Sequence, residues 1–331
     1  MHLPKFTYLN PTSMEEAVAF LKEHPNAGLM AGGTDILPRM KNRLDVPEVL
    51  VGLQGIPWEV PSVRPDGSLA INPLMTLDAV NRAPLIRERA PVLSDAALMV
   101  ASSEIRNMGT LGGNLCQQTR CLYYNQRHSF QFMEPCYKRD GDRCYFIPKG
   151  RKCWAVFMSD TAPGLISLST EIKVVGLEKM RTIPLEELYT GDAKKPFALD
   201  PDEMVSEIIV PEAPGSRGEA FFKFSLRGGV EFAALNVAAV LDMKEDRKTC
   251  AQARITVGAL SSSPRRALKG EAALVEQELS RDLFFEVADI VAKEITPIPH
   301  HGFPAAYLTE CLRVGTMRVL ESATERIRRK K

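Results

Sequence analysis

Five of the seven cysteines in this 331-residue chain fall in one segment: Cys116, Cys121, Cys136, Cys144 and Cys153. Cysteines gathered in this way serve as thiolate metal ligands, as disulfide partners or as a redox pair. Their spacings are C-x4-C, C-x14-C, C-x7-C and C-x8-C. The chain has no C-x2-C pair of the structural zinc type, and the spacings match neither standard ferredoxin run. Spacing alone therefore leaves an iron–sulfur cluster, a zinc site and coincidence open.

Aromatic and basic side chains lie among these cysteines. The aromatic residues are Tyr123, Tyr124, Phe130, Phe132, Tyr137, Tyr145, Phe146 and Trp154. They could exclude water from a cluster or simply pack the loop. The basic residues of the same stretch are Arg127, Lys138, Arg139, Arg143, Lys149, Arg151 and Lys152, against the acids Glu134, Asp140 and Asp142. The positive excess could dock an acidic protein, neutralise a thiolate-bound cluster or be solvated.

Two glycine turns precede this segment in the sequence. Ala31, Gly32, Gly33, Thr34 and Asp35 follow a short apolar strand predicted over 28–30. Adjacent glycines permit positive φ and let backbone N–H groups converge on an anion, although a plain turn is the alternative. The second turn contains Thr110, Gly112, Gly113 and Asn114. Neither turn is the G-x-G-x-x-G fingerprint, but two such turns suit one ligand that carries a pyrophosphate.

Composition limits the class of protein. The chain is 45% hydrophobic and 25% charged with a net charge of +1, as in soluble globular proteins of two or three domains. This balance favours neither nucleic acid nor an anionic membrane as a partner. No apolar run reaches the ~18–20 residues of a membrane helix, and the start lacks a signal-peptide core. We therefore expect a cytoplasmic protein with reduced thiols, which disfavours disulfides.

The pattern of elements predicts an α+β fold. Residues 1–56 are expected to form β-α-β, with a helix over 14–23 that Thr12 or Ser13 and a glutamate cap. Helices are expected over about 76–82 and 84–101 with breaks near two prolines, and strands at GLISLS (164–169), EIKVVGL and EMVSEIIV. Residues 213–220 look like a linker. Antiparallel strands are expected to come next, and helices over about 265–294 and 303–329 complete the chain. No nucleophile–base set stands out, so we expect no catalytic residue and favour a redox cofactor.

Four stretches carry a family resemblance: AGGTDILPRMK (31–41), IRNMGTLGGNL (105–115), SDTAPGLISL (159–168) and FFKFSLR (221–227). Over nearly its whole length the chain resembles the FAD-binding medium subunit of the xanthine dehydrogenase, or molybdenum hydroxylase, family. The resemblance implies a two-subdomain FAD-binding module at 1–56 and 57–214, followed by a C-terminal α+β domain at 217–331.

The resemblance also implies roles for individual residues. Ala31 to Asp35 match the first pyrophosphate loop, and Thr110, Gly112, Gly113 and Asn114 match the second. Asp160 matches an acid near the polar edge or ribityl chain of the flavin, and Lys223 matches a basic residue near the flavin.

One departure from the family is specific. About forty residues, roughly 116–155, separate the second glycine turn from SDTAP, where most members have about ten. In this the chain is similar to the beta subunit of the 4-hydroxybenzoyl-CoA reductase branch, whose insertion holds a 4Fe–4S cluster. A related insertion occurs in FAD subunits of some bacterial aldehyde oxidases. The resemblance implies Cys121, Cys136, Cys144 and Cys153 as cluster ligands and leaves Cys116 for FAD or the base of the loop.

The same branch implies a complex. A large subunit would hold the molybdenum cofactor and the substrate, a small subunit would hold two 2Fe–2S clusters, and the trimer would double to a heterohexamer. Electrons from ferredoxin would pass through the 4Fe–4S cluster and FAD to convert 4-hydroxybenzoyl-CoA into benzoyl-CoA. The alternatives are the FAD subunit of a molybdenum aldehyde oxidase or hydroxylase and a zinc-binding scaffold without a redox role.

Overall fold

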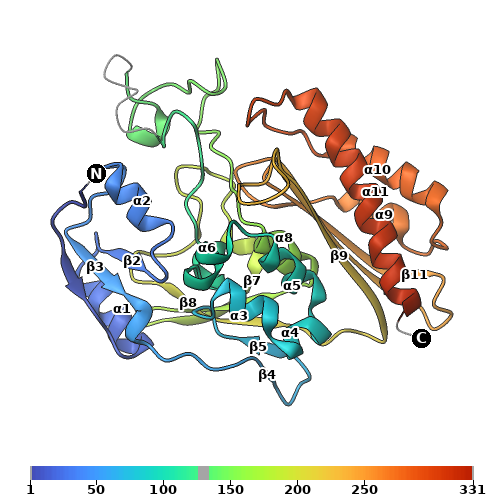
Figure 1. Cartoon of the computed structure of the whole chain (residues 1–331), viewed down its shortest axis with the longest axis horizontal. Coiled ribbons are helices and arrows are strands. Elements are labelled where there is room, and N and C mark those ends of the chain that lie inside the picture. The colour runs from blue at the N-terminus through green and yellow to red at the C-terminus, as the bar shows by residue number, and fades with distance from the viewer. Residues whose placement is uncertain (1, 126–133, 330–331) are drawn as a thin grey trace.

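The computed structural model describes residues 2–125 and 134–329. Arg127, Phe130 and Phe132 of the predicted insertion therefore lie outside the described residues. Three units follow one another along the chain, each built on its own sheet (Figure 1). Within the described part, no helix combines the length and the apolar character needed to cross a membrane.

The N-terminal unit is a small parallel sheet with strand order β1-β3-β2, in which helices make the connections. Its elements are β1 (Thr7–Leu9), α1 (Met14–Glu23), β2 (Gly28–Met30), α2 (Ile36–Lys41) and β3 (Val49–Gly52). The predicted capping box of α1 is present: the Ser13 hydroxyl accepts from the Glu16 N–H at 3.2 Å, and the Glu16 carboxylate accepts from the Thr12 N–H at 2.7 Å. Ala17, Val18 and Leu21 form the buried face of α1.

The middle unit is a five-stranded antiparallel sheet with helices on one side. Its strand order is β4-β5-β8-β6-β7. The strands are β4 (Ser62–Val63), β5 (Leu69–Ile71), β6 (Glu171–Val175), β7 (Met180–Pro184) and β8 (Met204–Val210). The helices are α3 (Leu77–Arg82), α4 (Pro84–Arg89), α5 (Pro91–Leu98), α6 (Ser103–Met108), α7 (Leu111–Leu115) and α8 (Thr161–Ser167). Pro84 and Pro91 each stand in the first turn of a helix, so the predicted breaks fall where expected.

The prediction of a strand at GLISLS was wrong, because residues up to Ser167 belong to helix α8. Every residue of α8 is buried, between α5 on one side and β10 and β11 on the other. A short segment that is buried all round shows no period of 2 or 3.6, so its pattern cannot distinguish strand from helix.

The C-terminal unit is an antiparallel sheet of order β12-β11-β10-β9 covered by three helices. Its strands are β9 (Ser216–Phe224), β10 (Leu235–Met243), β11 (Cys250–Gly258) and β12 (Arg265–Arg266), and its helices are α9 (Leu268–Leu274), α10 (Arg281–Glu294) and α11 (Ala305–Arg329). The predicted linker at 213–220 was wrong in its second half, where β9 already begins. All nine residues of β10 are buried, because α11 packs on one face and α8 on the other.

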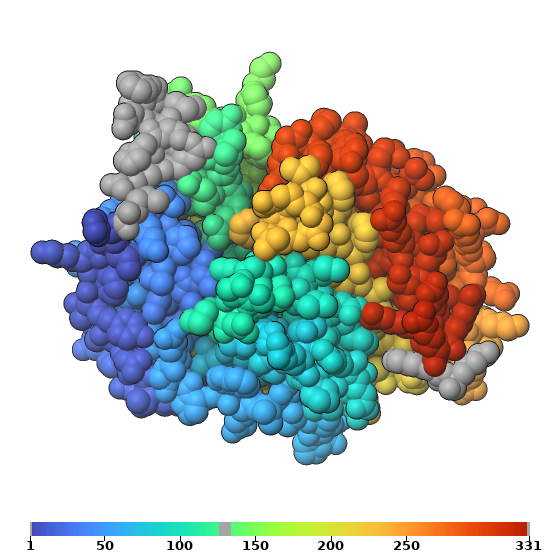
Figure 2. Space-filling model, in the orientation of Figure 1, coloured from blue at the N-terminus to red at the C-terminus, as the bar shows by residue number. Residues whose placement is uncertain are grey.

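The described part of the insertion rises above the junction of the three units (Figures 1 and 2). Its base is fixed by two backbone hydrogen bonds, from the Arg120 N–H to the Val156 carbonyl (2.7 Å) and back (2.9 Å). Beyond this bridge, its regular structure among the described residues is a 3₁₀ turn, η2 (Tyr137–Arg139), and an isolated bridge between Cys136 and Arg143.

Candidate cofactor-binding sites

A cavity of about 850 Å³ lies where the three units meet, and we call it the junction cavity. Such a volume is typical of a site for a large organic ligand. All but one of the FAD-binding residues expected from the sequence line it: Ala31, Gly32, Gly33, Thr34, Asp35, Thr110, Gly112, Gly113, Asn114 and Asp160. Lys223 is the exception. The fold therefore gathers two glycine turns that are about 80 residues apart onto one cavity, as the pyrophosphate interpretation requires.

The first glycine turn leaves backbone donors free. Gly33 has a φ of +73°, a conformation that favours glycine. In the described part of the chain, the N–H groups of Gly33 and Thr34 donate no hydrogen bond. A Cβ on Gly32 would lie 1.7 Å from the Met108 carbonyl oxygen, so the turn packs directly on another backbone segment. Unpaired amides beside a cavity fit an anionic group such as a pyrophosphate.

In the second glycine turn, unlike the first, the glycine N–H groups are already hydrogen-bonded within the protein. The Gly112 N–H donates to the Pro73 carbonyl at 2.8 Å, and the Gly113 N–H donates to the Thr110 hydroxyl at 3.1 Å. These donors are therefore already used inside the protein. A Cβ on Gly112 would lie 2.8 Å from the Pro73 Cβ. The glycines of this turn permit close packing and close approach of a ligand, whereas the first turn supplies the free amides.

Asp35 braces the first turn. Its carboxylate accepts hydrogen bonds from the guanidinium groups of Arg39 and Arg120, and from the Gln118 N–H at 3.3 Å. Arg39 also pairs with Asp45. A carboxylate engaged by two cations is poorly suited to face a phosphate itself. We conclude that Asp35 orients the glycine turn and ties it to the base of the insertion.

Asn114 and Asp160 join segments at the back of the junction cavity. The Asn114 side-chain oxygen accepts from the hydroxyls of Ser159 (2.6 Å) and Thr161 (2.7 Å). Asp160 accepts from the Asn236 amide at 2.8 Å and from the Lys223 ammonium at 2.7 Å. Burial raises the pKa of Asp160, and the Lys223 ammonium and the Asn236 amide oppose that rise.

Lys223 lies behind Asp160, outside the cavity lining. Its ammonium also donates to the carbonyl oxygens of Met99 (2.8 Å) and Glu231 (2.9 Å), and its side chain is 3% exposed. All three N–H groups are thus engaged by the protein. Lys223 connects the middle and C-terminal units, while its direct contact with a flavin stays a prediction.

The lining also includes residues that were not predicted as cofactor ligands from the sequence, among them Arg120, Phe232 and His301. The Arg120 guanidinium lies 5.0 Å from the centre of the Phe232 ring, and the buried Arg120 Nε has no hydrogen-bond partner among the described residues. Phe232 and His301 belong to loops of the C-terminal unit. Only folding brings these loops to the cavity, so no local sequence pattern could have identified them.

Cys116 lines the junction cavity and not the pocket of the other four cysteines. This agrees with the expectation that it lies near FAD or the base of the loop. Burial raises the pKa of the Cys116 thiol to about 12. The thiol therefore stays protonated at neutral pH, and the thiolate is the reactive form.

We predict that Cys116 resists alkylation. In the native protein at pH 8.5, iodoacetamide should modify Cys116 at least tenfold more slowly than in the same protein unfolded in urea. Raising the pH from 9 toward 12 should progressively remove this protection as the thiol ionises. Peptide mass spectrometry after timed quenching measures both rates. Equal rates in the two states would show that Cys116 is accessible and ionised.

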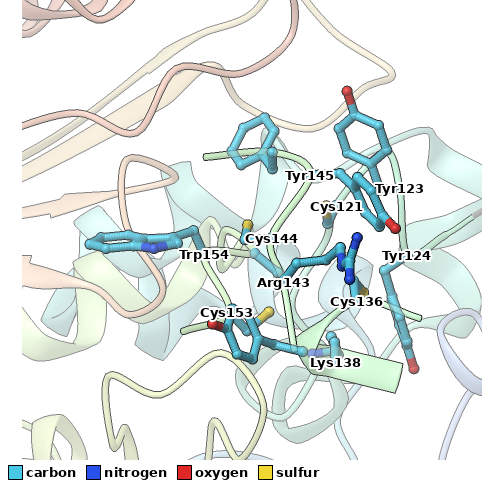
Figure 3. A pocket seen from close by; sticks show the side chains of 13 residues that line it. Cys121, Tyr123, Tyr124, Cys136, Lys138, Arg143, Cys144, Tyr145, Cys153 and Trp154 are labelled. Atoms are coloured by element: carbon cyan, nitrogen blue, oxygen red, sulfur yellow. The ribbon is translucent and has the colours of Figure 1, made fainter. Parts of the chain in front are cut away.

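The other four insertion cysteines line a second pocket, which we call the cysteine pocket (Figure 3): Cys121, Cys136, Cys144 and Cys153. All four are free thiols. Its wall is largely aromatic and includes Tyr123, Tyr124, Tyr145 and Trp154 (Figure 3). The structure thus brings together the four cysteines expected as ligands although they span 33 positions of sequence, counted from 121 to 153.

The cysteine pocket offers four thiol donors, the number that either a 4Fe–4S cluster or a Cys₄ zinc site uses. Among the described residues, no three His, Cys, Asp or Glu side chains lie close enough to hold one metal ion. The free space between the thiols is about 20 Å³, and Arg143 crosses the middle of the view between them (Figure 3).

Lys138 forms the floor of the cysteine pocket. Its ammonium donates to Gln118 Oε1 (2.7 Å), the Ala193 carbonyl (2.6 Å) and the Thr119 hydroxyl. It also lies 5.1 Å from the centre of the Tyr124 ring. Burial lowers the pKa of Lys138 to about 8, and the negative charge of Cys153 opposes this.

Comparison with known proteins identifies the family. Residues 4–213 match the family described as the FAD binding domain in molybdopterin dehydrogenase, and residues 220–323 match the CO dehydrogenase flavoprotein C-terminal domain. The 6-hydroxypseudooxynicotine dehydrogenase complex subunit alpha of Paenarthrobacter nicotinovorans is 27% identical over 99% of this chain and 97% of its own. The aldehyde oxidoreductase FAD-binding subunit PaoB of Escherichia coli is 28% identical over 81% of this chain and 86% of its own.

Solved structures agree on the fold. Carbon monoxide dehydrogenase from Hydrogenophaga pseudoflava matches with a TM-score of 0.81 at 24% identity, covering 98% of this chain and 99% of that chain. Quinoline 2-oxidoreductase from Pseudomonas putida 86 matches with a TM-score of 0.80 at 20% identity, covering 99% of each. The chain belongs to the family of FAD-binding subunits of molybdenum hydroxylases, and FAD is the cofactor of that family domain.

Proposed function

We propose that this chain is the FAD and iron–sulfur subunit of a molybdenum enzyme complex of the 4-hydroxybenzoyl-CoA reductase type. The observation that carries the proposal is the pair of sites: a junction cavity with free amides beside a cysteine pocket with four free thiols. When bound, FAD and a 4Fe–4S cluster supply the electron-transfer chemistry. The substrate site and the molybdenum cofactor belong to a large partner subunit, and two 2Fe–2S clusters belong to a small one.

The residues of this chain hold and shield these groups. The amides of Gly33 and Thr34 receive the pyrophosphate, with Asp35 and Arg39 fixing their turn. Asp160 would lie beside the flavin, and the Lys223 ammonium holds its carboxylate in place. Around the cysteine pocket, Tyr145 and Trp154 limit access of water to the thiolates. No residue of this chain is assigned a role in proton or acyl transfer.

The electron donor in this proposal is a reduced ferredoxin. The side chain of Arg143 is 52% exposed, Arg151 and Lys152 are exposed, and all three lie on the insertion around the cysteine pocket. An acidic one-electron carrier would be attracted to such a face, and its electron would enter close to the four thiolates.

A second candidate is the FAD subunit of a molybdenum aldehyde oxidoreductase. The similarity to PaoB of Escherichia coli, an aldehyde oxidoreductase subunit, favours it. The two functions share both sites in this chain and differ in the substrate bound by the large subunit and in the direction of electron flow.

The proposal is tested on the complex purified through this chain without oxygen. Dithionite-reduced viologen dye and 4-hydroxybenzoyl-CoA are supplied, and dye oxidation is followed together with benzoyl-CoA as product. Turnover supports the reductase. In a parallel assay with oxidised dye, dye reduction that depends on an added aldehyde, without turnover of the thioester in the first assay, assigns the chain to the aldehyde oxidoreductases instead.

Metal analysis tests the cysteine pocket independently of substrate. We expect about four iron atoms and about four acid-labile sulfides for this pocket. Cys136→Ser should lower both contents of the pocket, whereas Cys250→Ser, in a buried position of the C-terminal unit, should leave them unchanged. One zinc without sulfide would reject the cluster and support a zinc scaffold.

A further inference from the structure

One short segment of the chain touches both sites. Cys116, Gln118 and Arg120 line the junction cavity, and Cys121 lines the cysteine pocket. The pairing of Arg120 with Val156 fixes this segment between them. The two pockets therefore have this segment as a common wall.

A line of hydrogen bonds crosses this wall. It starts in the cysteine pocket at the Lys138 ammonium, which donates to Gln118 Oε1 at 2.7 Å. The Gln118 N–H donates to Asp35 Oδ2 at 3.3 Å. Asp35 directly follows Gly33 and Thr34, which line the junction cavity and whose amides donate no hydrogen bond among the described residues. Three residues thus connect the thiols of one site with the glycine turn of the other.

The Lys138 ammonium, where this line of hydrogen bonds starts, has no carboxylate partner among the described residues. Among the described residues, no carboxylate lies within ion-pair distance of the Lys138 ammonium, whose partners are carbonyl, amide and hydroxyl oxygens. A buried cation is costly unless negative charge lies nearby. The thiols that share its pocket, Cys121 and Cys153, would supply that charge as ligand thiolates.

We propose that Lys138 is a positioning residue that couples the two sites, so that occupancy of the cysteine pocket strengthens FAD binding in the junction cavity and FAD in turn orders the cysteines. The thiolate charge stabilises the Lys138 ammonium, which donates a hydrogen bond to the Gln118 side chain. The Gln118 N–H donates to Asp35, and this contact fixes the first glycine turn. The identity of the two groups rests on the proposed function, but the coupling is a property of this chain. Binding free energies couple reciprocally, so each group must favour the other by the same factor.

The first test compares FAD dissociation constants of the full chain with and without its iron and sulfide, measured without oxygen by flavin fluorescence. We expect wild-type protein to bind FAD about 5- to 150-fold more tightly when the cysteine pocket is loaded. Lys138→Met should bring this ratio close to one. Gln118→Met, which breaks the line at its middle, should do the same with Lys138 intact.

The matched control is Lys152→Met. The Lys152 ammonium lies over the Trp154 ring at 4.7 Å on the same insertion, but it is exposed and has no contact with Gln118. It should keep the wild-type ratio. A wild-type ratio of one, or an unchanged ratio in both Lys138→Met and Gln118→Met, would overturn the proposal.

The second test needs no metal and so separates this proposal from the proposed function. In the metal-free full chain, FAD should slow modification of Cys121 by iodoacetamide several-fold, as read by peptide mass spectrometry. The protection should disappear in Lys138→Met and persist in Lys152→Met. Equal protection in both variants, or none in the wild type, refutes the coupling. A chain that binds no iron yet shows Lys138-dependent protection refutes the cluster and keeps the coupling.

Discussion

Replacing Lys223 with methionine should lower the free energy of unfolding by about 3–5 kcal/mol, the usual result of leaving one member of a buried ion pair unpaired. The side chains of Lys223 and Asp160 are 3% and 5% exposed, and their charged atoms are 2.7 Å apart. Without the ammonium, the Asp160 carboxylate keeps one side-chain donor, Asn236. The carbonyl oxygens of Met99 and Glu231 lose a donor as well.

Urea unfolding followed by circular dichroism measures this loss. The double variant Lys223→Met with Asp160→Asn should recover part of the stability, because no unpaired charge then remains buried. Lys22→Met is the control: Lys22 is 53% exposed and lies 3.4 Å from Asp202, so its pair should contribute less than about 1 kcal/mol. A loss of less than about 1 kcal/mol in Lys223→Met would mean that the pair does not join the middle and C-terminal units.

Replacing Gly32 with alanine should weaken FAD binding roughly 10- to 100-fold. A Cβ at this position would lie 1.7 Å from the Met108 carbonyl oxygen and 2.5 Å from its carbon. A backbone carbonyl cannot rotate away like a side chain, so the first glycine turn must shift. Overpacking of this kind costs about 1–3 kcal/mol, and each 1.4 kcal/mol corresponds to a tenfold change in affinity. The shift would carry the free amides of Gly33 and Thr34 away from their places.

Flavin absorbance of the purified chain and fluorescence titration with FAD measure the effect. Gly229→Ala is the matched control, because a Cβ there meets no atom within 4 Å. Gly229 lies in the loop between β9 and β10 that also carries Phe232, so it tests the same substitution near the same cavity. Unchanged FAD affinity in Gly32→Ala would show that the first glycine turn does not hold the cofactor.

Local sequence patterns predicted the parts of this protein that depend on local contacts. The capping box at Ser13 and Glu16, the helix starts at Pro84 and Pro91, and the special backbone of Gly33 each involve atoms a few residues apart. The family motifs also identified both glycine turns and the four cysteines that share one pocket. Helix α8 was missed for the opposite reason, since uniform burial by distant strands erased its local pattern.

The amino-acid sequence by itself determined which chemical groups are present: free thiols, glycine turns and a flavin-domain framework. Only the tertiary structure decided how they act together. In the folded chain, Asp35 of the first glycine turn pairs with Arg120, 85 positions away. Lys223 likewise pairs with Asp160, 63 positions away. The tertiary structure also set Lys138 against Gln118, between the two pockets. Such contacts depend on how separate units pack, because buried charges must find partners wherever the fold brings them, and spacing along the chain does not encode that choice.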